Sequence, residues 1–346
     1  MSHTRAYLAA ASLLALAACG PDPQPQPKPA TPVAIAPPAP VALPAPVLAG
    51  GAIDTAQYQA PASDQRTPDV IRAQVLLDRA HFSPGVIDGR SGENVRQAIA
   101  AYETSVGLPS DGVLDQAVFD RLTAADGAPV TMSYAITAED VAGPFVPDLP
   151  KDLVDQAKLK KLAYRGPQEL LAEKFHMTED LLAALNPGVD FGQAGASITV
   201  AAISPTVLPE VVASIEVDKT ERSVKAFNAQ GRLLAFYPAS IGSDDRPAPS
   251  GLLKVVAVAP NPTYTYDPSR LTFGDKQKKV TIPPGPNSPV GSVWIDLSED
   301  TFGIHGSDEP AQIGKHFSHG CIRLTNWDAL QLSKSVKKGV PVKFTG

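Results

Sequence analysis

The side chains best suited to chemistry lie near the C-terminus, where His305, His319 and Cys321 fall within seventeen residues. An acyl-transfer enzyme with a cysteine nucleophile needs a thiolate, a base that accepts the thiol proton, and backbone N–H groups that hold an oxyanion. Gly320 permits a tight turn, which leaves Cys321 and its own N–H accessible to a substrate carbonyl. This pattern predicts acyl transfer through Cys321.

The elements around these residues are predicted to be strands. Segments 293–297 and 301–305 read as β-strands, so we expect His305 at a strand end, facing Cys321 across a loop. His305 then accepts the thiol proton, or its imidazolium stabilises a thiolate that is already formed. The two possibilities are open at this point.

The spacing of this motif resembles that of a known family. His305 precedes Cys321 by sixteen residues, and residues 318–323 read Ser-His-Gly-Cys-Ile-Arg. This is similar to the L,D-transpeptidase catalytic domain (YkuD-like). The resemblance implies that Cys321 forms a thioester on peptidoglycan stem peptides: a tetrapeptide donor loses its terminal D-alanine, and an amine acceptor resolves the thioester. The products are 3-3 crosslinks or envelope protein attached to the wall.

The resemblance also implies roles for the neighbouring residues. Gly306 orients the base histidine through its main-chain carbonyl, and Gly320 supplies an oxyanion N–H together with Cys321. His319 shapes the pocket by hydrogen bonding, with a second base as the alternative, and Arg323 binds a stem carboxylate or shapes the loop. Ser318 is expected on the substrate side as a turn former.

Other readings of the same residues remain. Water in place of the amine would make the protein an L,D-carboxypeptidase or another hydrolase, and a non-catalytic peptidoglycan-binding lipoprotein is the third alternative. A zinc site would need His305, His316, His319 and Cys321, whose spacing matches no established closed site. We therefore expect neither a metal nor a cofactor.

Composition narrows the class of partner. The chain has 346 residues, enough for two or three domains, and 36 acidic against 30 basic side chains give a net charge of −6. Because no basic run stands out, the composition disfavours nucleic acid as a partner.

The N-terminus predicts export and a lipid anchor. Arg5 precedes an apolar stretch over 6–18 that is shorter than the ~20 residues needed to span a bilayer. The sequence ending at Cys19 resembles a bacterial lipoprotein box, which makes 1–18 a signal peptide; an ordinary signal peptide is the alternative. Residues 19–60 are the lipidated cysteine and a Pro/Ala-rich tether. Gly20 favours the outer membrane over the inner one, so we expect a periplasmic, lipid-anchored protein.

Two accessory regions are expected before the catalytic one. Residues 61–128 predict three short helices, and the turns Ile-Asp-Gly at 87–89 and Gly-Leu-Pro-Ser-Asp-Gly at 107–112 resemble the peptidoglycan-binding domain 1 family. Whether this region binds glycan is open, and a purely structural spacer is the alternative. Residues 129–206 weakly resemble a LysM module of two helices and two short strands. A linker domain specific to this family is the alternative.

Residues 207–346 are predicted to form a mainly β catalytic domain. Segments 211–217, 222–227, 233–239 and 252–258 alternate or run apolar between Gly and Asn turns, which indicates a β-sandwich or open barrel of the L,D-transpeptidase type. A helix is expected from 325 to 339 and a last strand over 340–344. Segment 260–289 is expected to be a loop or lid on the substrate side.

Overall fold

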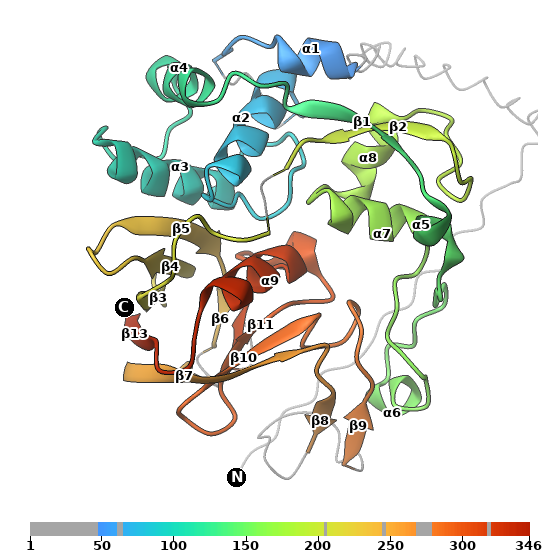
Figure 1. Cartoon of the computed structure of the whole chain (residues 1–346), viewed down its shortest axis with the longest axis vertical. Coiled ribbons are helices and arrows are strands. Elements are labelled where there is room, and N and C mark those ends of the chain that lie inside the picture. Colours follow the sequence, from blue (N-terminus) through green and yellow to red (C-terminus); the bar gives the residue numbers. More distant parts are fainter. Residues whose placement is uncertain (1–47, 61–64, 204–205, 244–246, 268–278, 317–319) are drawn as a thin grey trace, which may run out of the picture. The chain divides into compact units, whose positions relative to one another are not determined.

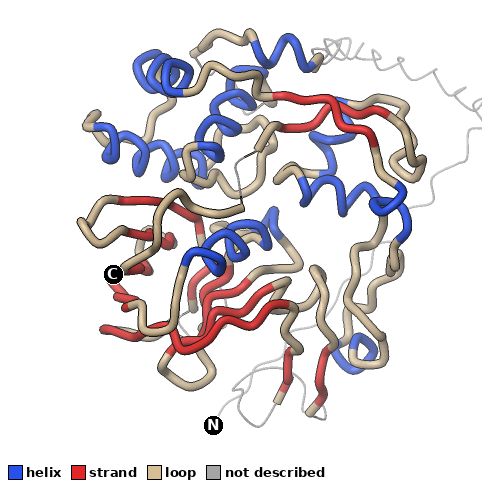
Figure 2. The backbone as a smooth tube through the Cα atoms, in the orientation of Figure 1, coloured by secondary structure: helices blue, strands red, loops and turns tan. Residues whose placement is uncertain are grey.

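The computed structural model describes residues 48–60, 65–203, 206–243, 247–267, 279–316 and 320–346. Val47–Gly346 form one unit, in which helices dominate the N-terminal half and strands the C-terminal half (Figure 2). The predicted signal peptide and Cys19 lie outside the described residues, as do Ser318 and His319.

Helices form the first part of this unit. They are α1 (Gly50–Asp54), α2 (Pro68–Arg79), α3 (Glu93–Val106) and α4 (Gln116–Ala125) (Figure 1). The Asp115 carboxylate accepts from the Val118 N–H and caps α4, whereas Thr67 precedes α2 without a side-chain cap. The three helices expected between 61 and 128 are therefore present, and α1 precedes them.

A second part mixes strands and helices. It contains β1 (Thr131–Ala135), α5 (Ala138–Ala142), α6 (Leu153–Gln156), α7 (Pro167–Lys174), α8 (Glu179–Leu185) and β2 (Ser197–Ala201). Strands β1 and β2 pair antiparallel. The pair of short strands with α7 and α8 has the composition expected of a LysM module, and that resemblance stays a prediction.

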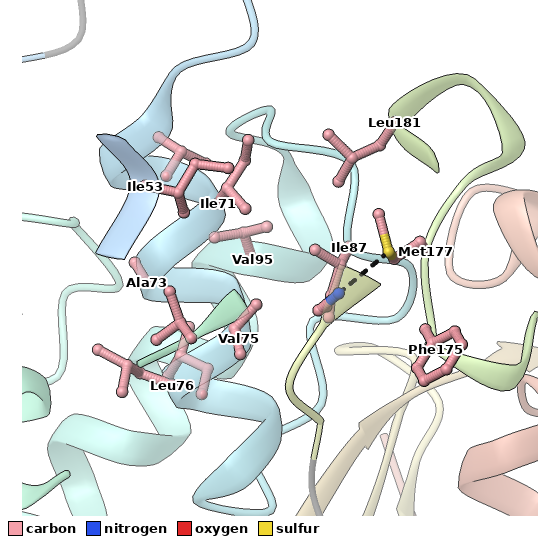
Figure 3. Packing of buried hydrophobic residues seen from close by; sticks show 14 of the residues in the cluster. Ile53, Ile71, Ala73, Val75, Leu76, Ile87, Val95, Phe175, Met177 and Leu181 are labelled. Atoms are coloured by element: carbon pink, nitrogen blue, oxygen red, sulfur yellow. Dashed lines mark hydrogen bonds between the residues drawn. The ribbon is translucent and has the colours of Figure 1, made fainter. Parts of the chain in front are cut away.

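These two parts share one hydrophobic core. Figure 3 shows Ile71 and Val75 of α2 in the same cluster as Met177 and Leu181. A β-bridge joins Ile87 to Met177, and a second one joins Phe82 to Phe236 of the C-terminal sheet. The two accessory parts therefore pack against each other at the density of a protein core. The bridge from Phe82 also brings the first of them into contact with the C-terminal sheet. The domain boundaries themselves remain predictions.

The C-terminal part is mainly β. Its main sheet contains β3 (Ser214–Asp218), β4 (Ser223–Phe227), β5 (Leu233–Pro238), β6 (Ser240–Ile241), β7 (Gly251–Pro260), β10 (Val293–Leu297), β11 (Gly303–His305), β12 (Ile322–Arg323) and β13 (Pro341–Thr345). In the described residues the order is β5-β4-β3-β13-β7-β10-β11-β12-β6. The end strands β5 and β6 are separated by one residue along the chain, so the sheet curls into a nearly closed barrel. This confirms the expected fold class.

Helix α9 (Asn326–Ser335) fills one face of this sheet (Figure 1). Its Ala329 and Leu332 are fully buried in the apolar core with Ile295 of β10. The alternating burial of β3 and β10 follows from the period of two in a half-buried strand. The helix ends at Ser335, four residues before the expected end.

Segment 260–289 contains more structure than its sequence indicates. Strands β8 (Tyr264–Tyr266) and β9 (Val280–Ile282) pair antiparallel there. A pair of three-residue strands leaves too short an alternating pattern to be recognised in the sequence.

Candidate active site

His305 is positioned by strand pairing. It is the last residue of β11, where it pairs with Trp294 of β10 on one side and with Arg323 of β12 on the other. The Trp294 and His305 rings stack with their centroids 5.2 Å apart and an interplanar angle of 17°. Only 2% of His305 is exposed, so its ring is held in place by packing.

Gly306 fixes the tautomer of His305. The imidazole Nδ1 lies 2.7 Å from the Gly306 carbonyl oxygen. Because a carbonyl only accepts, Nδ1 carries the proton and donates, and Nε2 of the neutral ring is the proton acceptor. The geometry is the one predicted for Gly306.

Gly306 also has no room for a side chain. A Cβ at this position would lie 2.2 Å from Asn326 Oδ1, the oxygen that accepts from the Ser292 N–H at 3.0 Å. The glycine therefore lets α9 approach the end of β11 closely.

The environment keeps His305 neutral. Burial, then the nearby positive charge of Arg323, lower the pKa of His305 to about 3, against a small opposing effect of the Gly306 carbonyl. The ring is therefore uncharged at pH 7, and its Nε2 carries no proton.

Cys321 lies immediately before β12 and is half-buried. Its Sγ lies 3.6 Å from the Thr301 carbonyl oxygen, to which the thiol donates a weak hydrogen bond. The preceding Gly320 has φ 109°, a backbone conformation that disfavours residues with a side chain. Gly320 thus has a backbone conformation that a tight turn could use, and the residues before it, 317–319, lie outside the described ones.

His305, Cys321 and Arg323 line one cavity of about 940 Å³, which we call the Cys321 cavity. Aromatic side chains form much of its wall: Tyr264, Tyr266, Trp294 and Phe302. Its charged wall residues are balanced, with Asp267 and Asp296 against Lys279 and Arg323. The cavity can hold a peptide beside both the thiol and the imidazole.

Sequence reasoning missed Trp294 and Thr301, which contact the predicted catalytic pair. The strand assigned to 293–297 contained Trp294, but its pairing with His305 depends on register, which the sequence does not reveal. The Thr301 contact is made by a main-chain oxygen, so no side-chain signal could indicate it.

Three further properties concern the described residues alone. No group of three His, Cys, Asp or Glu side chains among them is arranged to bind a metal ion. His316 is exposed there. None of the helices in the described part of the chain is both long and apolar enough to cross a membrane.

Comparison with known proteins assigns two regions. Residues 213–343 match the family described as "L,D-transpeptidase catalytic domain", and residues 66–122 match "Putative peptidoglycan binding domain". The "Putative L,D-transpeptidase YkuD" of Bacillus licheniformis is 32% identical over 180 residues, which cover 51% of this chain and 92% of that protein. The "Probable L,D-transpeptidase ErfK/SrfK" of Escherichia coli is 27% identical over 193 residues, covering 52% of this chain and 61% of that one.

Among solved structures, the L,D-transpeptidase from Mycobacterium smegmatis matches 44% of this chain and 64% of its own, with 20% identity and a TM-score of 0.32. The fold is that of an L,D-transpeptidase catalytic domain joined to a peptidoglycan-binding-type helical region. The chain belongs to the YkuD family of L,D-transpeptidases.

Proposed function

We propose that the protein is an L,D-transpeptidase that acts on peptidoglycan stem peptides through a thioester on Cys321. His305 Nε2 takes the Sγ proton, and the thiolate attacks the carbonyl of the L,D bond in a tetrapeptide donor. The C–N bond breaks, and the departing D-alanine takes the proton from the imidazolium.

An acceptor amine completes the reaction. Its nitrogen attacks the thioester, a new amide forms, the C–S bond breaks, and the proton released by the amine returns to the thiolate by way of His305. The Gly320 and Cys321 N–H groups hold the oxyanion in both steps; such a donor contributes about 10²–10³-fold to the rate. The products are 3-3 crosslinks or envelope protein attached to the wall.

The observation that supports this reaction best is the tautomer of His305 in the cavity that Cys321 also lines. The two side chains line one cavity, and the Gly306 carbonyl holds the proton of the ring on Nδ1, which leaves Nε2 as the nitrogen with a free lone pair. Because burial and Arg323 disfavour a charged imidazole, general-base removal of the thiol proton is favoured over an ion pair formed in advance.

Arg323 is proposed to bind a stem carboxylate. It lines the cavity beside His305, and its buried Nε has no hydrogen-bond partner among the described residues. A guanidinium forms paired hydrogen bonds with a carboxylate, which suits this role. Ser318 and His319 keep their predicted roles as turn former and pocket shaper.

We also propose a periplasmic location with a lipid anchor on Cys19, at the outer membrane. The support is the lipoprotein-type sequence that ends at Cys19, with Gly20 after it. The helical region over 66–122 would hold the enzyme near glycan. A Cys19→Ala variant would test the anchor: the protein should move from the membrane fraction to the soluble periplasm.

Purified protein and tetrapeptide muropeptides test the reaction by mass spectrometry. Crosslinked dimers are expected, and their absence together with accumulating tripeptides would identify a hydrolase instead. The Cys321→Ala variant should lose both products, and full turnover by this variant would exclude the thioester. A carbapenem should add its mass to the parent protein at Cys321.

A further inference from the structure

A second cavity shares a wall with the Cys321 cavity. Its volume is about 850 Å³, and we call it the Asn287 cavity. Segments 149–156 and 165–180 of the accessory part line it opposite 308–312 of the C-terminal part. Arg323 and Pro289 line both cavities. A ligand in the Asn287 cavity therefore lies across Arg323 from the space beside Cys321.

The wall of the Asn287 cavity is acidic. Among the described residues its ionisable side chains are six acids (Glu169, Glu173, Glu179, Asp180, Asp308 and Glu309) and three cations (Lys151, Arg165 and Arg323). Burial raises the pKa of Glu173 to about 8, so this acid is neutral at pH 7. Arg165 already bridges Glu169 and Glu179, each at 2.9 Å, whereas Asp180 and Glu309 are exposed. The remaining excess of carboxylates attracts a cation.

Two buried amide oxygens in the same wall need a hydrogen-bond donor. Asn287 is 2% exposed; its Nδ2 donates to the Ala163 carbonyl at 3.1 Å and to Glu169 at 3.3 Å, and its Oδ1 has no partner within the described part of the chain. Gln156 is 7% exposed; its Nε2 donates to the Pro150 carbonyl at 2.8 Å, and no described residue donates to its Oε1. The acceptors of each nitrogen fix the amide orientation, so it is the oxygens that are left over.

Buried polar atoms of this kind are nearly always hydrogen-bonded. The two oxygens can only accept, so the missing group carries N–H or O–H donors. A primary ammonium offers three N–H donors and one positive charge, which matches two carbonyl-type oxygens in an acidic wall.

We propose that the Asn287 cavity binds the ammonium group of the acceptor peptide. This inference builds on the proposed transpeptidation, because it assigns a place to the second substrate of that reaction. The bound ammonium gives its proton to water or to a carboxylate of the wall and passes Arg323 into the Cys321 cavity, where the neutral amine attacks the thioester. The Asn287 cavity therefore collects the acceptor, while the chemistry stays at Cys321. The accessory segments 149–156 and 165–180 thus become part of the substrate site.

Binding can be measured without the reaction. The full-length Cys321→Ala protein is titrated by calorimetry with N-acetyl-lysinamide, which carries one ammonium, and with its neutral diacetylated analogue. The ammonium compound should bind at least tenfold more tightly. Adding Asp180→Lys and Glu309→Lys should weaken its binding at least tenfold, whereas Asp120→Lys, an exposed acid outside both cavities, should not change it. Equal binding of the two compounds, or unchanged affinity after charge reversal, overturns the proposal.

Kinetics on the catalytically competent protein give a second test. In Asp180→Lys/Glu309→Lys the KM for the acceptor peptide should rise at least tenfold, and the ratio of crosslinked to hydrolysed product should fall. Gln156→Met removes one accepting oxygen without a change of charge and should shift the ratio the same way. Melting temperatures verify that each variant is folded.

The binding and kinetic experiments distinguish a failure of this proposal from a failure of the proposed function. Tight ammonium binding without any thioester leaves the cavity assignment standing and refutes the transpeptidase. A thioester that forms normally, with an unchanged acceptor KM in the variants, refutes the cavity assignment alone.

Discussion

Each of the two cavities contains a buried ionisable group that is neutral at pH 7. Its pKa is lowered in one cavity and raised in the other. In the Cys321 cavity, burial and Arg323 lower the pKa of His305 to about 3. In the Asn287 cavity, burial raises the pKa of Glu173 to about 8, although the Asn326 amide donates to it at 3.0 Å. Desolvation disfavours the charged form in both cases. The result is a base beside the thiol and a carboxylic acid in the other wall.

The two cavities also differ in where their charged side chains lie. The Cys321 cavity balances its charges and adds aromatic rings, which suits a peptide that must be held while its carbonyl reacts. The Asn287 cavity keeps its charge on exposed carboxylates such as Asp180 and Glu309. Four predictions test this contrast.

The largest effect is expected for His305→Gln, which removes the proposed base but keeps a side chain of similar size. Acylation of Cys321 should slow by about 10³-fold, because general-base catalysis contributes about 10²–10⁴-fold. The rate of D-alanine release measures it. His316→Gln, at an exposed histidine, should release D-alanine at the rate of the parent. The same rate in His305→Gln would show that His305 is not the base.

Gly306→Ala should destabilise the packing of α9 against the end of β11. A Cβ would lie 2.2 Å from Asn326 Oδ1, and Asn326 also donates to Glu173 and to the Pro286 carbonyl. Overpacking of this kind costs about 2 kcal/mol, which urea unfolding can measure. Gly127→Ala has open space around the new methyl group and is the control. Equal stability of both variants would show that the close approach is not needed.

Glu173→Gln should change how stability depends on pH. The folded protein holds the Glu173 proton up to about pH 8, whereas a carboxyl with the ordinary pKa of 4.5 releases it much earlier. The folded state therefore binds more protons between these values, and the free energy of unfolding falls as pH rises through that window.

The glutamine has no proton to lose, so Glu173→Gln should gain stability relative to the parent by up to about 1 kcal/mol per pH unit from pH 5 to 8. Urea unfolding at several pH values measures it, and Glu139→Gln, at an exposed site, should keep the slope of the parent. Parallel curves for Glu173→Gln and the parent would mean that Glu173 is ionised in the folded state.

The smallest effect concerns Arg323, which both cavities share. Its charge lowers the pKa of His305, so Arg323→Gln should raise that pKa by about one unit. The acidic limb of the acylation profile should then move to higher pH, because the imidazole must be neutral to accept the proton. Carbapenem acylation followed from pH 3 to 7 measures the limb. If the acidic limb stays at the same pH in this variant, Arg323 does not lower the pKa of His305.

The sequence predicted the parts of this molecule that depend on local pattern. The strand at 293–297, the helix that starts after Thr325 and the positive φ of Gly320 all follow from alternation, capping and glycine chemistry. The spacing between His305 and Cys321 likewise indicated that these two residues share one site, which is the Cys321 cavity.

The Asn287 cavity could not be predicted in this way. It joins Gln156 and Glu169 to Asn287 and Glu309, which are more than a hundred positions apart in the chain. Their meeting depends on how α7 packs beside the C-terminal sheet, and single-sequence patterns carry no information on such long-range packing. The shared core of Phe82 and Phe236 was missed for the same reason.

The intact mass of the protein after brief mixing with a tetrapeptide donor tests the central claim most directly. A thioester on Cys321 predicts an added mass equal to the donor minus D-alanine, present in the parent and absent in Cys321→Ala. Turnover of the donor without any such adduct on the parent, or an adduct that persists in Cys321→Ala, would contradict a reaction through this thiol.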